Sequence, residues 1–153
     1  MRRDVLIALG LLLGCESEPA DPAASCADCG LLQRPVLGLL CGDGVPDDSL
    51  FAAHFGALAM VDAGTGQPGY PDESLGPRFS RKAALELRAD VRAPLEVLVC
   101  VRSRTTHQLV FNQFHQVAPP SVLVALGSFA RDHYILHLKT HTRHLRSIVF
   151  ASE

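Results

Sequence analysis

Four histidines near the carboxyl end have the spacing of metal ligands. His133, His137 and His141 lie four residues apart, and His144 follows three residues later. On an α-helix this spacing places the rings on one stripe, where neighbouring pairs chelate Zn²⁺ or Cu²⁺. On a β-strand, four residues span about 13 Å, which is too far for one metal ion to bridge. A transition-metal site at these histidines therefore depends on a helical conformation.

Basic side chains are the second candidate for chemistry. Residues 74–153 hold eleven Arg and Lys against five Asp and Glu, whereas residues 16–73 hold one against ten. Guanidinium groups bind phosphate and carboxylate through paired hydrogen bonds, which makes Arg102 and Arg104 a candidate anion-binding pair. The alternative is a mixed, solvated face, because acids such as Glu96 interleave with the bases. The net charge of the whole chain is −2, so we expect no nucleic-acid partner.

Enzymatic signatures are absent from the 153 residues. The chain has no G-x-S-x-G nucleophile elbow, no phosphate-binding P-loop, no H-E-x-x-H and no dinucleotide fingerprint. We therefore expect a protein that is not an enzyme and that has no cofactor beyond the Zn²⁺ or Cu²⁺ considered above. A small hydrolase remains an alternative, because scattered Ser, His and Asp residues can meet in a folded chain.

The amino terminus has the pattern of a targeting segment. Met1-Arg2-Arg3 is basic, and the nine residues from Val5 to Leu13 are apolar or glycine. A membrane-spanning helix needs about 20 apolar residues, so this run is too short to be a permanent span. Its length is typical of the apolar part of a secretory signal peptide.

The end of this apolar run, Leu12-Leu13-Gly14-Cys15, resembles the lipobox of bacterial lipoproteins. The resemblance covers about fifteen residues and identifies an export route rather than a fold. It implies that the Cys15 thiol carries diacylglycerol, that residues 1–14 are removed, and that fatty acyl chains such as palmitate anchor the protein to the cell envelope. Several buried chains make a stable anchor, where one chain is marginal. In family terms, Glu16 after the cysteine favours the outer membrane.

Four cysteines remain when Cys15 is lipidated. They are Cys26, Cys29, Cys41 and Cys100. An exported protein meets an oxidising compartment, so we expect disulfides, although three pairings are open. Free thiols, or a metal or redox site at the Cys26–Cys29 pair, are the alternatives; a zinc site normally needs a second such pair.

The rest of the chain divides into a tether and one domain. Residues 15–30 are acidic, small and proline-bearing, which predicts a lipidated flexible tether. Residues 31–153 are expected to form a single β-rich domain. Near its start, Ser49 precedes the alanine- and leucine-rich residues 50–61, which predicts a short helix with Ser49 as its N-cap.

From residue 80 onward, apolar and polar residues alternate with a period of two. A strand places such alternating apolar residues on one face, whereas a helix scatters them around its circumference. Breaks such as Pro94, Pro119-Pro120 and Gly127 separate the runs. Six short strands are predicted, at 83–91, 95–101, 108–117, 122–126, 134–140 and 145–150.

These patterns predict a mostly β protein: a small antiparallel β-sandwich, loosely jelly-roll-like, with one short N-terminal helix. One segment has a rival interpretation, because residues 132–148 contain no Gly or Pro and hold apolar residues at helical spacing. The alternation and the β-branched residues in this segment favour a strand.

The expected function is a non-catalytic binding or assembly module of the cell envelope. Its partner would be an envelope protein, an acidic glycan or a phosphate group. A transition-metal-binding lipoprotein is the alternative from a different functional class.

Overall fold

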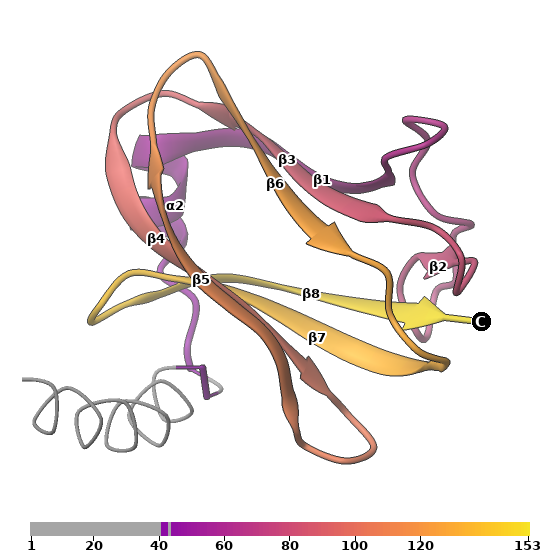
Figure 1. The fold of residues 1–153 in the computed structure, drawn as a ribbon. Coiled ribbons are helices and arrows are strands. Elements are labelled where there is room, and N and C mark those ends of the chain that lie inside the picture. Colours follow the sequence, from indigo (N-terminus) through magenta and orange to yellow (C-terminus); the bar gives the residue numbers. More distant parts are fainter. Residues whose placement is uncertain (1–40, 43) are drawn as a thin grey trace, which may run out of the picture. The chain divides into compact units, whose positions relative to one another are not determined.

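A computed structural model describes residues 41–42 and 44–153 (Figure 1). These residues belong to the compact unit Leu37–Glu153. The predicted signal peptide, the tether, Cys15, Cys26 and Cys29 lie outside the described residues.

The described part of the chain holds one helix, α2 (Asp48–His54), and strands that fall into two sheets. The strands are β1 (Phe55–Asp62), β2 (Arg78–Phe79), β3 (Leu85–Val91), β4 (Leu95–Ser103), β5 (Leu109–Val117), β6 (Ser121–Gly127), β7 (Asp132–Lys139) and β8 (His144–Ser152).

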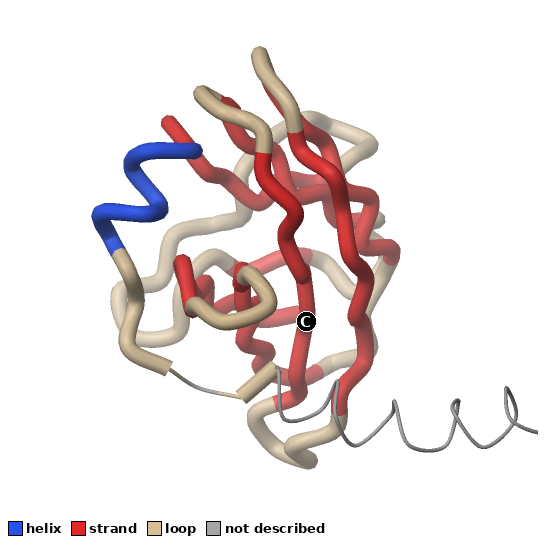
Figure 2. Tube along the Cα trace, turned by 90° about the vertical axis from the view of Figure 1, so that its left-hand side faces the viewer, coloured by secondary structure: helices blue, strands red, loops and turns tan. Residues whose placement is uncertain are grey.

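The two sheets differ in the number of strands, and one of them contains a parallel strand pair. The three-stranded sheet has the order β1-β3-β6 and is antiparallel throughout. The five-stranded sheet has the order β2-β8-β7-β4-β5, in which only the short β2–β8 pair is parallel. Figure 2, which colours strands red and helices blue, shows how little helix this part of the chain contains.

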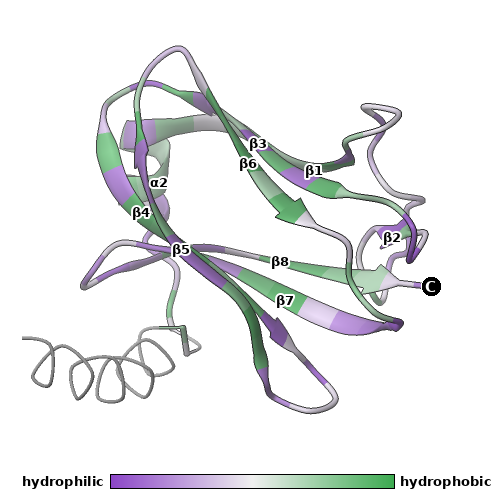
Figure 3. Cartoon of the chain, viewed as in Figure 1, coloured by the Kyte–Doolittle hydropathy of each residue, from purple (hydrophilic) through white to green (hydrophobic). Residues whose placement is uncertain are grey.

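A hydrophobic core joins side chains of both sheets. Alternate residues of β3, such as Leu85 and Leu87, are buried with alternate residues of β4 and β7, such as Val99 and Leu136. Figure 3 shows the same alternation as bands of apolar and polar residues along the strands. Burying each large apolar side chain contributes about 1.5–3 kcal/mol, so the period of two in the sequence is the main determinant of this fold.

Aromatic rings fill one part of this core. The Phe150 ring centroid lies 5.2 Å from that of Tyr134 and 5.4 Å from that of Phe129. The Tyr134 hydroxyl donates to the Ala130 carbonyl oxygen at 2.9 Å, so the polar end of the ring has a partner.

The prediction of a mostly β, sandwich-like fold with one short helix near its start is confirmed. The six predicted strands match β3 to β8 to within a few residues. The segment 132–148 is extended, as its alternation indicated, because β7 and β8 occupy most of it.

The predicted helix over residues 50–61 is wrong in its second half. The helix ends at His54, and Phe55–Asp62 form strand β1. Pairing with β3 supplies β1 with hydrogen bonds and a buried face, and this tertiary gain outweighs the helical propensity of its alanines. The N-cap is Asp47 rather than Ser49: the Asp47 carboxylate accepts a hydrogen bond from Leu50 N at 2.9 Å.

Candidate functional site

The turn between β7 and β8 gathers basic side chains. Lys139 ends β7, His144 begins β8, and residues 140–143 connect them. Thr140 closes this turn: its N–H donates to the Arg143 carbonyl at 2.8 Å, and its hydroxyl oxygen accepts from Arg143 N at 3.0 Å. The turn therefore returns Arg143 and His144 to the neighbourhood of Lys139.

A hollow of about 300 Å³ lies at this turn, and we call it the basic hollow. It is lined by Gly44, Val45, Lys139, His141, Thr142, Arg143 and His144. Gly44 lies close against His144: a Cβ at residue 44 would stand 3.1 Å from both Cβ and Nδ1 of that histidine. The backbone at Gly44 and Val45 thus forms one wall, and the β7–β8 turn forms the other.

The two cationic chains of the basic hollow are held by nearby oxygens. Lys139 Nζ donates to the Gly42 carbonyl oxygen at 3.0 Å. Arg143 Nη1 lies 3.5 Å from Asp47 Oδ2, and two thirds of the Arg143 side chain is exposed. An ion pair at this distance with a largely exposed guanidinium is weak, so Asp47 holds the Arg143 side chain only loosely.

A second group of side chains borders the hollow on the five-stranded sheet. His141 Nε2 lies 2.5 Å from Glu96 Oε1, and the His141 ring stacks on Phe114 with centroids 4.7 Å apart. The Gln116 amide donates to the other Glu96 oxygen. These contacts hold the imidazole at the rim of the hollow.

Two buried histidines share one hydroxyl beside the hollow. His137 Nδ1 lies 3.0 Å and His144 Nε2 2.9 Å from Ser147 Oγ. His137 and Ser147 are opposite each other across the β7–β8 pair, which explains why they meet. A hydroxyl can donate to one ring nitrogen and accept from the other, so Ser147 can satisfy both imidazoles at once.

The structure separates the histidines that the sequence offered as a metal site. His133 lies at the start of β7, where its backbone carbonyl accepts from Arg104 N, and His141 lies in the turn beyond the other end. Only His137 and His144 come together, with ring centroids 5.3 Å apart. Within residues 41–42 and 44–153, no three His, Cys, Asp or Glu side chains are arranged to hold a metal ion.

Arg102 and Arg104, the predicted anion-binding pair, lie at the opposite end of the five-stranded sheet from the basic hollow. Arg102 is opposite Ile135 in the β4–β7 pairing, and Arg104 is exposed in the turn after β4. That turn is organised by Asp132, whose carboxylate accepts from the hydroxyls of Ser103 and Thr105, both at 2.5 Å. These bonds to Ser103 and Thr105 lower the pKa of Asp132 below its ordinary value of 3.8.

A disulfide joins Cys41 to Cys100, which is one of the pairings left open by the sequence. Both cysteines are fully buried and pack with Leu98 on the face of β4 that points away from the main core. Their Cα atoms are 6.0 Å apart, as is usual for disulfides. The bond fixes the segment that leads into the basic hollow onto the five-stranded sheet.

Sequence reasoning missed Gly44, Arg143 and Lys139 as parts of one site. The signal present in the sequence is the cluster of bases and histidines around residues 139–144, whose spacing also fits a metal-binding stripe or a solvated face. No local sequence pattern indicates that Gly44 lines this hollow, because Gly44 lies almost one hundred residues before the β7–β8 turn in the chain.

The comparison of this chain with protein-family models, curated proteins and solved structures finds no match. Among the described residues, no helix is both long and apolar enough to cross a bilayer.

Proposed function

We propose that the protein is a lipid-anchored component of the bacterial cell envelope whose folded domain binds an anionic partner without catalysing a reaction. The export and anchoring parts rest on the basic start, the short apolar run and the Leu12-Leu13-Gly14-Cys15 pattern. The binding part rests on the structure of the β7–β8 turn.

The observation that carries the binding proposal is the convergence of four nitrogen-bearing side chains on one hollow. Lys139, His141, Arg143 and His144 line it together with the backbone of Gly44. Lysine offers a point charge, and arginine offers a planar pair of donors that matches phosphate or carboxylate geometry. The partner is therefore a phosphate group or an acidic glycan rather than a neutral sugar.

The binding test compares two exposed arginines at opposite ends of the same sheet. The full chain is applied to a sulfated-glycan column, and the salt concentration at elution is measured for the native protein, Arg143→Gln and Arg104→Gln. We expect Arg143→Gln to elute at clearly lower salt and Arg104→Gln to elute as the native protein does. Equal elution of all three proteins would reject the basic hollow as the site, and a shift confined to Arg104→Gln would move the site to the other end.

The anchoring test uses labelling with a radioactive fatty acid in cells. We expect the native chain to incorporate palmitate and Cys15→Ser to incorporate none, while Cys26→Ser serves as the matched cysteine control. Mass spectrometry of the native product should find residue 15 as the first residue. An intact Met1 and no attached fatty chain would refute the lipoprotein proposal.

A further inference from the structure

One wall of the basic hollow belongs to no strand or helix. Gly44 and Val45 line it, and residues 44–46 are all exposed, Val45 to 90%. No backbone hydrogen bond joins residues 44–46 to another described residue, and Pro46 has no N–H to donate. This wall therefore has neither buried side chains nor backbone hydrogen bonds of its own that fix its position.

The two ends of this wall are fastened to the five-stranded sheet. At one end, the disulfide joins Cys41 to Cys100 on β4. At the other end, Asp47 N donates to the His144 carbonyl oxygen at 2.8 Å. The position of the wall follows from these two attachments, of which the disulfide is the covalent one.

The disulfide lies close to the lysine of the basic hollow. In the β4–β7 pairing, Lys139 is opposite Leu98, which is two residues from Cys100 on the same strand. Gly42 follows Cys41 directly, and its carbonyl oxygen accepts from Lys139 Nζ at 3.0 Å. The bond thus places both the wall and an oxygen that orients the lysine.

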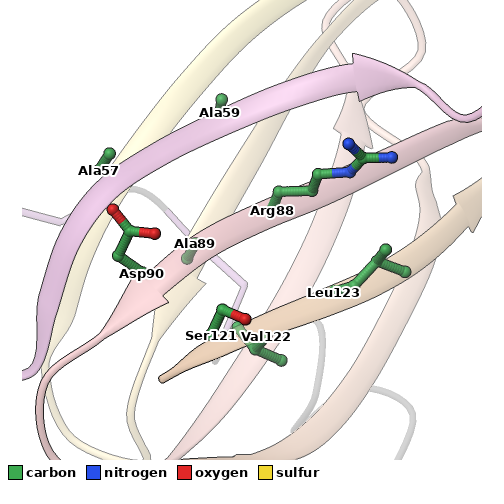
Figure 4. A pocket seen from close by; sticks show the side chains of 8 residues that line it. All are labelled: Ala57, Ala59, Arg88, Ala89, Asp90, Ser121, Val122 and Leu123. Atoms are coloured by element: carbon green, nitrogen blue, oxygen red, sulfur yellow. The ribbon is translucent and has the colours of Figure 1, made fainter. Parts of the chain in front are cut away.

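A second hollow of the described chain does not depend on such an attachment. The depression of about 440 Å³ over the three-stranded sheet is lined by residues of β1, β3 and β6 (Figure 4). Those strands pair along their length, so their backbone hydrogen bonds hold the lining residues in place. Gly44 and Val45 have no such pairing, and the basic hollow depends instead on how the chain before α2 is attached.

We propose that the Cys41–Cys100 disulfide is a positioning element of the anion site, so that the basic hollow binds anions only after this bond has formed. Without the bond, the wall keeps its attachment at Asp47 but not the one at Cys41, and Lys139 loses its contact with Gly42. An anion that binds must then also order this segment, which costs conformational entropy. The inference rests on the proposed function, because it concerns the same site.

The bond also makes binding depend on export. Its formation takes two protons and two electrons from the thiols of Cys41 and Cys100 and passes them to a protein disulfide of the oxidising compartment, which becomes a dithiol. Thiols stay reduced in the cytosol, so the hollow is not formed there. Both cysteines are fully buried in the folded domain, so reductants do not reach the bond. Its formation is therefore a maturation step rather than a reversible switch.

The test measures the salt concentration at which the full, oxidised chain elutes from a sulfated-glycan column. The native protein is compared with Arg143→Gln, with Cys41→Ala/Cys100→Ala as the disulfide variant, and with Cys26→Ser/Cys29→Ser as the control variant. The cysteine changes leave the net charge unaltered, so a shift reports the site itself. Far-UV circular dichroism at the column temperature confirms the fold. If the alanine pair does not fold, Cys41→Ala/Cys100→Val, which fills more of the buried space, becomes the disulfide variant.

A second measurement follows the lysine directly. The chain has two lysines, Lys139 and the exposed Lys82. A limiting amount of an amine-acylating reagent, followed by mass spectrometry, therefore gives the acylation of Lys139 relative to an internal reference. A disulfide that only stabilised the fold would leave this ratio unchanged in folded protein.

We expect the control variant to elute with the native protein and the disulfide variant to elute at the lower salt of Arg143→Gln. The ratio of Lys139 to Lys82 acylation should rise severalfold in the disulfide variant and stay at the native value in the control variant.

The outcomes separate this inference from the proposed function. When Arg143→Gln elutes early but the folded disulfide variant elutes with the native protein, the inference is overturned and the proposed function stands. Early elution of the disulfide variant with an unchanged acylation ratio overturns the inference as well. Elution of Arg143→Gln with the native protein overturns the proposed function itself, and the inference with it.

Discussion

The rings of His137 and His144 meet almost at right angles, with an interplanar angle of 87° and their centroids 5.3 Å apart. Both histidines are buried, and both hydrogen-bond to the Ser147 hydroxyl. Because the two rings are buried, the loss of this hydroxyl leaves an imidazole nitrogen without its hydrogen-bond partner.

Ser147→Ala is therefore expected to destabilise the domain by about 1–3 kcal/mol, because two imidazole nitrogens lose one partner each. Urea unfolding of the full chain measures the change. Ser121→Ala, at an exposed serine at the start of β6, is the matched control and should leave the unfolding midpoint unchanged. Equal midpoints for Ser147→Ala and the native protein would show that the shared hydroxyl contributes nothing to stability.

The stability of the domain should fall in acid because two aspartates titrate below their ordinary pKa of 3.8. The hydroxyl and N–H of Ser74, with Arg78, hold the pKa of Asp72 well below this value, and the hydroxyls of Ser103 and Thr105 lower the pKa of Asp132. A carboxyl with a depressed folded pKa adds stability above its unfolded pKa and loses it as the pH falls through the folded pKa.

The double variant Asp72→Asn/Asp132→Asn should consequently unfold more easily than the native protein at pH 7, and its melting temperature should depend less on pH below about pH 4. Thermal melts between pH 7 and pH 2 measure both effects. Glu73→Gln, at an exposed carboxylate next to Asp72, is the control. Parallel pH profiles for the native protein and the double variant would contradict this account.

Removing the Cys41–Cys100 bond should destabilise the domain by about 2–4 kcal/mol, because the bond closes a long loop in the unfolded chain. The two cysteines are 59 residues apart. A reducing agent should lower the melting temperature of the native chain but not that of Cys41→Ala/Cys100→Ala. Cys26→Ser/Cys29→Ser should remain as sensitive to reduction as the native chain; insensitivity would assign the stabilising bond to a different pair.

Two glycines with positive φ give a matched test of backbone strain against steric clash. Gly76 has φ of +74°, and a Cβ there would lie 1.9 Å from the Val149 carbonyl oxygen. Gly127 has φ of +83°, and a Cβ there meets nothing within 4 Å. Gly127→Ala should cost about 1 kcal/mol for the backbone conformation alone.

Gly76→Ala adds the clash with β8 to the same conformational cost, so we expect a loss several times larger than that of Gly127→Ala. Chemical denaturation of both variants provides the comparison. Similar losses for the two alanines would mean that the chain around residue 76 relaxes away from Val149.

The strands of the second half could be predicted from the sequence because alternation is a local property. In β3, buried Leu85, Leu87, Ala89 and Val91 alternate with polar residues, and a strand is the conformation that buries such a set on one face. Strand β1 could not be predicted in this way. Its residues Ala57, Ala59 and Met60 suit a helix in isolation, and pairing with β3 decides the conformation.

The candidate site was less accessible to sequence reasoning than the fold. The spacing of His133, His137 and His141 indicates a shared face in either conformation, but the extended chain carries His133 and His141 to opposite ends of β7. The partners of the remaining histidines come from Ser147 across a strand pair and from Gly44 in a distant segment. Such neighbours are set by register and topology, which a local pattern does not contain.

The Cys41–Cys100 bond also determines how mechanical load enters the molecule. A pull on the chain ahead of Cys41 passes through the two sulfur atoms directly to β4, which lies between β7 and β5 in the larger sheet. Because the disulfide carries this force to β4, little of it reaches helix α2 and edge strand β1, which come next after Cys41 in the sequence. A domain held in this way resists being peeled open from its amino-terminal end, and tension instead acts across the hydrogen bonds of an interior strand.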